Sequence, residues 1–188
     1  MDRSLKQNTP EAFRQQLRSG HYNELRVALY FMLRGHAARL GFDGQSFDIT
    51  VVPGPEFGQR SPFRVEVKWD KHAALTGNAY FETSNPRSGK PTGIRSSTAD
   101  WWAHVLGEGQ EALLMPLEGL RNWLEARPYR SVGTRGSDSN SRGLLVPLVD
   151  LAQERRFLRV QLPTPEEFFD DLLRQAFQGS SGKPDRNG

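Results

Sequence analysis

Two stretches of alternating apolar and polar residues decide the fold, VEVKWD at residues 65–70 and FDITVV at residues 47–52. Alternation of this kind is typical of a half-buried β-strand. Glu66 and Lys68 are two residues apart, so on a strand they project from the same face. If the strand containing Asp48 lies beside them, two carboxylates and an ammonium group meet over one patch. Such a patch could hold a divalent cation and activate a bound water molecule.

The composition sets broad limits on the class of protein. The chain has 188 residues, 36% of them hydrophobic, with 11 Phe and 4 Trp, which is enough for one domain with a substantial core. There is no Cys, which excludes disulfides, thiolate nucleophiles and cysteine-ligated zinc. The net charge of +3 permits a nucleic-acid partner without requiring one.

The sequence lacks the patterns of targeting and membrane segments. The N-terminal residues 1–13 contain no apolar signal core, and no run approaches the roughly 18 apolar residues of a membrane span. We therefore expect a soluble, cytoplasmic protein without membrane partners.

Periodicity and turn residues predict an alternation of helices and strands. Helices are predicted over residues 13–40, with a division at Gly20, and over residues 98–106, 117–126 and 164–177. Strands are predicted over residues 47–52, 65–70, 78–83, 112–115 and 144–151. Residues 130–142 have the composition of a mobile polar loop. We expect residues 1–178 to form a single domain and residues 179–188 a disordered C-terminal tail.

The order of helix, three strands, helix and strand, with an acidic residue before a Glu-x-Lys, resembles the PD-(D/E)xK nuclease superfamily. The match is Asp48, 17 intervening residues, and then Glu66-Val67-Lys68. Phe47 stands where the superfamily often has Pro. The resemblance implies an α/β fold with a restriction-endonuclease-like core, a central mixed β-sheet flanked by helices in αβββαβ order. Residues 70–101 and 144–148 further resemble a phage and cyanophage branch of nucleases.

The resemblance implies a metal-dependent DNA endonuclease or exonuclease. Asp48 and Glu66 would then bind Mg²⁺ or Mn²⁺, with the Val67 carbonyl as a third ligand. Lys68 would orient the attacking water or stabilise the transition-state charge, and these roles stay open. Glu24, on the first helix, is similar to a helical Glu that many members add to the metal shell.

Each candidate also has an ordinary structural interpretation. Asp48 could be a solvated position on an edge strand, and Glu66 with Lys68 a surface ion pair. Glu24 could simply lie on the wet face of its helix. Glu82 could join the metal shell if its strand pairs with the Glu66 strand, or could instead bind a basic residue such as Arg95. Asp70, at the end of its strand, would lie just outside a metal shell.

Basic residues downstream of the proposed site suggest contacts with DNA. Arg87 and Lys90 occupy a loop with two Gly, and Arg95 and Arg135 follow in later segments. Loop amides and basic side chains hold a phosphate backbone without reading its sequence. The loop could equally be a solvated hairpin tip. DNA is thus the expected partner and a homodimer is possible, while the alternative is a non-catalytic DNA-binding or regulatory module on the same fold.

Overall fold

The computed structural model describes residues 10–41, 47–58, 60–133 and 141–180. Its α-helices are α1 (Pro10–Met32), α2 (Ala73–Thr76), α3 (Leu117–Glu125), α4 (Leu148–Gln153) and α5 (Pro165–Ser180). Short 3₁₀ turns follow β2 and β4, at η1 (Pro55–Phe57) and η2 (Gly93–Arg95). The described part of the chain contains no helix both long enough and apolar enough to cross a bilayer.

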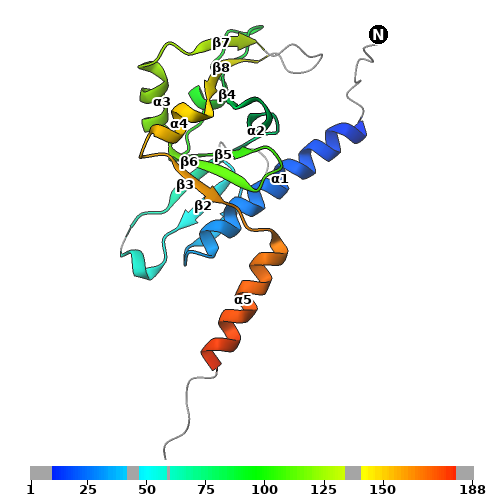
Figure 1. Ribbon diagram of the computed structural model, residues 1–188, viewed down its shortest axis with the longest axis vertical. Coiled ribbons are helices and arrows are strands. Elements are labelled where there is room, and N and C mark those ends of the chain that lie inside the picture. The colour runs from blue at the N-terminus through cyan, green and yellow to red at the C-terminus, as the bar shows by residue number, and fades with distance from the viewer. Residues whose placement is uncertain (1–9, 42–46, 59, 134–140, 181–188) are drawn as a thin grey trace, which may run out of the picture.

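A six-stranded mixed sheet forms the centre of the molecule (Figure 1). Its strands, in spatial order, are β1 (Ala37–Leu40), β2 (Ile49–Val52), β3 (Phe63–Asp70), β5 (Trp101–Leu106), β6 (Glu111–Pro116) and β9 (Leu158–Gln161). The pair β3–β5 is parallel and the other neighbours are antiparallel. Helices flank this sheet, so the predicted α/β class with a central mixed sheet is confirmed.

The strand β5 corrects the prediction of a helix over residues 98–106. The run from Trp101 to Leu106 is almost entirely apolar and five of its six residues are buried. A strand that is covered on both faces shows no alternation, because both sets of side chains enter a core. Asp100, within that predicted helix, instead accepts hydrogen bonds from the backbone and side chain of Arg64.

The first helix and the segment after it also differ from the prediction. α1 runs without a break through Gly20, because one Gly in a helix costs only about 1 kcal/mol and the helix packs on the sheet. The predicted helix continues to residue 40, whereas the chain turns at Gly35 and residues 37–40 form β1. Gly35 has φ of 81°, and a Cβ there would collide with the side chain of Glu56.

A second, three-stranded sheet covers one face of the central sheet. It contains β4 (Asn78–Ser84), β8 (Arg142–Pro147) and β7 (Arg130–Gly133) in the order β4-β8-β7. The predicted strand over residues 78–83 is thus confirmed, but its partner is β8 and not the strand that carries Glu66. Residues 130–133 and 142 of the predicted polar loop are in strands, and residues 134–140 lie outside the described residues.

Two cores follow from this layering. One core lies between the sheets and contains Phe81, Trp102 and Leu120. The other lies between the central sheet and α1 and contains Val27, Val65 and Val105. Odd-numbered residues of β3 therefore pack towards α1, and the even-numbered Glu66 and Lys68 lie on the face that the second sheet partly covers.

The last helix projects away from the body (Figure 1). Thr164 caps it: its Oγ1 accepts the N–H of Glu167 at 3.1 Å, and its own N–H donates to the Glu167 carboxylate at 2.7 Å. The helix extends to Ser180, three residues beyond the predicted end. Residues 181–188, in the predicted tail, lie outside the described residues.

Candidate active site

Asp48 lies close to Glu66, just before the start of β2. The antiparallel ladder pairs Ile49 with Val65 and Thr50 with Arg64, and its register ends at Ile49. The N–H of Asp48 donates to the carbonyl of Val65 at 3.0 Å, one position out of register with the Ile49–Val65 pair. The charge of Asp48 acts on both Glu66 and Lys68. The Asp48 carboxylate therefore lies near both side chains at the end of the ladder.

The side chain of Asp48 also binds the backbone of β3 at the point where β2 and β3 stop pairing. Its Oδ2 accepts the backbone N–H of Val67 at 2.6 Å. In an extended strand, the N–H and C=O of one residue point to the same side. The carbonyl of Val67 therefore points to the side of β3 on which Asp48 lies. The Asp48 carboxylate and the Val67 carbonyl are therefore on the same side of β3, at the end of the β2–β3 ladder.

Glu66 is held between a cation and a hydroxyl group. Its Oε1 lies 2.5 Å from Nζ of Lys68, and its Oε2 accepts a hydrogen bond from Oγ of Ser97 at 3.4 Å. Burial raises the pKa of Glu66, since only 12% of its side chain is exposed, and the charge of Asp48 adds to this increase against the opposing effect of Lys68. The ionised form of Glu66 is therefore less favourable than it would be in water, and a bound cation would stabilise it.

Lys68 is surrounded by carboxylates from three segments. Burial acts to lower the pKa of its ammonium group, but the charges of Glu66, Asp48 and Glu82 outweigh burial and raise it. Lys68 is therefore protonated at neutral pH. A permanent positive charge favours charge stabilisation over a role as proton acceptor.

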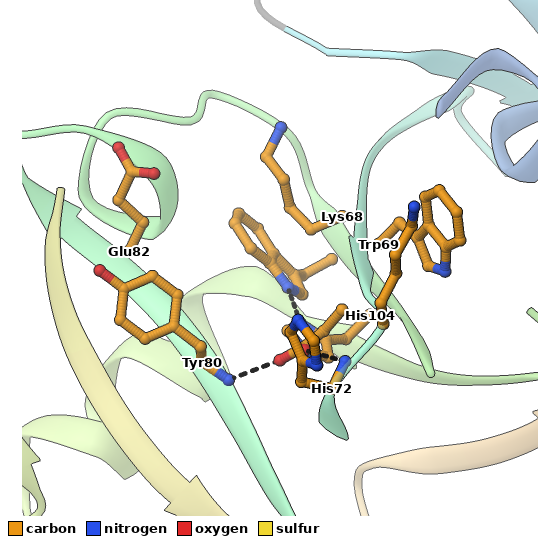
Figure 2. A pocket seen from close by; sticks show the side chains of 9 residues that line it. Lys68, Trp69, His72, Tyr80, Glu82 and His104 are labelled. Carbon is orange, nitrogen blue, oxygen red and sulfur yellow. Dashed lines mark hydrogen bonds and ion pairs between the residues drawn. The ribbon is translucent and has the colours of Figure 1, made fainter. Parts of the chain in front are cut away.

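Glu82 approaches the site from the second sheet. It lies on β4 and lines a cleft together with Lys68, as Figure 2 shows. The chain after β4 returns closely past it at Gly93, where φ is 53° and a Cβ would come within 2.5 Å of the Glu82 carbonyl oxygen. The sheet packing, and not strand pairing with β3, therefore places Glu82 near Lys68.

Glu24 is engaged elsewhere on its own helix. Its Oε2 lies 2.9 Å from Nδ1 of His21, one turn away, and its side chain is 17% exposed. A place in the metal shell stays a prediction for Glu24.

The predicted DNA-contacting residues lie at the surface beyond β4. Asn85 organises the loop, since its Oδ1 accepts the N–H of Arg87 at 2.9 Å and its own N–H donates to the carbonyl of Lys90. Arg87 and Lys90 are exposed at this hairpin tip, and Arg95 is exposed on η2. Arg135 lies outside the described residues.

The cleft contains polar groups that the sequence did not indicate as a set. It has a volume of about 540 Å³ and lies between β3, β5 and β4. Asp70 accepts the N–H groups of Ala73 and Tyr80 and faces Nε2 of His104, which is 1% exposed. These residues belong to four segments, and only the packing of one sheet on the other brings them together. The alternation of β3, which puts Asp70 on the face of Lys68, was the available signal.

The donor set at the candidate centre consists of oxygen atoms. Within the described ranges, no group of three or more His, Cys, Asp and Glu side chains is arranged to hold a metal ion. The set is instead two carboxylates and one carbonyl. Hard cations such as Mg²⁺ prefer oxygen ligands and keep several waters, so such a set is sufficient for one ion.

Comparisons with known proteins give similarity at the level of structure and none at the level of sequence. No known protein family and no curated protein matches the sequence. The structure of a bacterial homing endonuclease, I-Ssp6803I, aligns with a TM-score of 0.44 and 14% sequence identity, over 89% of this chain and 97% of that chain. A similarity of this size does not assign the chain to a family.

Proposed function

We propose that the protein is a metal-dependent deoxyribonuclease that hydrolyses phosphodiester bonds at Asp48, Glu66 and Lys68. The observation that supports this proposal is the closeness of the Asp48 carboxylate to Glu66 at the end of the β2–β3 ladder, with Lys68 in contact with Glu66. The PD-(D/E)xK-like order of these residues in the sequence points to the same chemistry.

Asp48, Glu66 and the Val67 carbonyl fit a divalent cation. Two neighbouring carboxylates repel each other, and the raised pKa of Glu66 reflects burial together with the charge of Asp48. Bound there, Mg²⁺ or Mn²⁺ would neutralise this repulsion, activate a water molecule and stabilise negative charge on the phosphate. The residues of the chain supply the rest: Asp48 and Glu66 fix the position of the charge, and Val67 holds Asp48 through its N–H.

Lys68 holds its proton at Nζ and places a positive charge beside the phosphate. Phosphodiester cleavage develops negative charge on the non-bridging and leaving oxygens, and a fixed cation lowers the energy of that state. The raised pKa of Lys68 supports this role over that of a base. In the resting protein the ammonium group rests on Glu66, so substrate binding has to move it over a short distance.

The same ion pair is the observation that favours the alternative, a non-catalytic DNA-binding module. Glu66 and Lys68 neutralise each other at 2.5 Å without a metal ion. Uptake of Mn²⁺ separates the two functions, since a module that does not bind cations has no means to activate water at this site.

The test combines metal binding with cleavage. Calorimetry with Mn²⁺ is expected to show binding to the purified protein and its loss in Glu66→Gln. A panel of single-stranded, duplex, flapped and branched DNA is expected to be cut by the wild type and not by Glu66→Gln or Lys68→Ala. Glu125→Gln, an exposed carboxylate at the end of α3, is the matched control and should behave as wild type. Wild-type cleavage by Glu66→Gln would refute the site, and DNA binding without Mn²⁺ uptake would favour the module.

A further inference from the structure

The cleft beside Lys68 is larger than the cation site requires. Lys68 and Glu82 lie at one end, and Tyr80 follows from the same strand as Glu82 (Figure 2). Lys71 and His72, which follow β3, line it further along. The cleft thus continues from the proposed catalytic residues along β3, in the direction of α2.

Its size fits one nucleotide. The cleft has a volume of about 540 Å³. Small-molecule sites typically have volumes of roughly 300–1,000 Å³. A base with its sugar and phosphate is a ligand of this class.

The lining has the chemistry of a nucleotide site. The ammonium group of Lys68 provides positive charge for phosphate. That of Lys71 lies 4.1 Å from the centre of the Trp69 ring, which packs on the α1 side of β3. The rings of Tyr80 and His72 offer faces on which a base can stack. Glu82 provides an acceptor for an amino or hydroxyl group.

The floor of the cleft is organised before any ligand arrives. The indole N–H of Trp102 donates to Nδ1 of His104 at 3.3 Å, so Nε2 of His104 carries the proton and donates to Asp70. Asp70 also accepts the N–H groups of Ala73 and Tyr80, which joins β3, β5, α2 and β4. A site whose walls are already fixed loses less conformational freedom when it binds.

We propose that this cleft binds a single unpaired nucleotide next to the phosphate that is cut. The substrate class is then DNA with an unpaired nucleotide at the point of cleavage, such as a single strand, a flap or a frayed end. The inference that cleavage occurs at this position depends on the proposed nuclease function. The inference that the cleft binds a nucleotide depends only on the residues that line it. Enzymes that act on unpaired nucleotides hold them in pockets of this kind.

Binding without turnover tests the site. Wild-type protein is titrated with dAMP and with inorganic phosphate in EDTA, with tryptophan fluorescence as the readout, because Trp69 and Trp102 line the cleft. Lys71→Ala/His72→Ala removes two exposed side chains and leaves the backbone N–H of residue 72 bonded to Asp70, so the variant should fold. We expect the double variant to bind dAMP at least about fivefold more weakly, from the loss of a stacking face. Arg155→Ala, at an exposed position on the loop before β9, should bind dAMP as wild type.

Equal dAMP affinity in wild type and the double variant, or dAMP affinity no higher than that for inorganic phosphate, would overturn the nucleotide site.

A cleavage assay with Mn²⁺ then compares a flapped substrate with the same sequence fully paired. We expect the flap to be cut at least about tenfold faster, and this preference to disappear in Lys71→Ala/His72→Ala while Mn²⁺ binding persists.

The two proposals fail in different ways. If fully paired DNA is cut as fast as the flap and the double variant has no effect, the unpaired-nucleotide inference is wrong and the nuclease assignment stands. If Glu66→Gln changes neither Mn²⁺ binding nor cleavage while the double variant still loses dAMP, the nuclease site is wrong and the nucleotide site stands.

Discussion

Asp48 supplies both a charge and a hydrogen-bond acceptor, and two substitutions separate these contributions. Asp48→Ala removes both, whereas Asp48→Asn keeps an oxygen of similar shape for the N–H of Val67. The two variants should therefore differ in folding stability but agree in the loss of metal binding.

The structure gives the expected size of the difference. Val67 is buried, so its N–H has no easy access to water once the acceptor is gone. Leaving a buried donor without a partner costs about 1–3 kcal/mol, and we expect Asp48→Ala to lose this much free energy of unfolding. Asp48→Asn should stay within about 1 kcal/mol of wild type, because a neutral hydrogen bond replaces a charge-assisted one. It also removes the negative charge that helps to raise the pKa of Glu66, so that pKa should fall.

Urea unfolding followed by tryptophan fluorescence measures the stabilities, with equal m-values as the check that the unfolded states match. Calorimetry with Mn²⁺ measures the metal site in the same three proteins. The reasoning is refuted if Asp48→Ala is as stable as wild type, or if Asp48→Asn binds Mn²⁺ with wild-type affinity.

Three further predictions concern Asp70, Lys68 and the hairpin tip. Burial acts to raise the pKa of Asp70, but hydrogen bonds from His104 and Tyr80 outweigh burial and lower that pKa. The ionised Asp70 therefore stabilises the folded protein at pH values above its ordinary pKa of about 3.9. This stabilisation is lost as the pH falls below that value. Asp70→Asn should be less stable at pH 7 and show a smaller loss of stability between about pH 4 and pH 3, and an unchanged acid-unfolding profile would contradict this. Lys68→Ala should stop cleavage but keep or strengthen Mn²⁺ binding, because Glu66 loses its competing cation, and loss of Mn²⁺ binding would count against the assigned role. Arg87→Ala/Lys90→Ala should weaken DNA binding for all sequences and reduce the slope of log affinity against log salt by about 2, one for each phosphate contact, whereas an unchanged slope would show that the tip does not touch DNA.

Local patterning was enough to predict the two strands of the candidate site. Alternation over residues 47–52 and 65–70 predicted β2 and β3, although β2 begins at Ile49, one residue after Asp48. Period-two alternation also predicted that Glu66 and Lys68 share a face, which their 2.5 Å contact confirms.

Features that depend on non-local packing were beyond sequence patterns. The strand at residues 101–106 was predicted as a helix, because burial on both faces removes the alternation that marks a strand. The position of Glu82 follows from the partner that β4 takes, and that partner lies about 60 residues later, in β8. His104 could not be connected with Asp70, since the contact requires the parallel pairing of β3 with β5.

The most direct test of the central claim is a crystal structure of the protein soaked in Mn²⁺, with the ion located by its anomalous scattering. We expect one strong peak between the carboxylates of Asp48 and Glu66, within coordination distance of the Val67 carbonyl oxygen, and its absence in Glu66→Gln crystals. A peak elsewhere in the wild type, or wild-type crystals in which this position stays empty at saturating Mn²⁺, would rule out the proposed metal site.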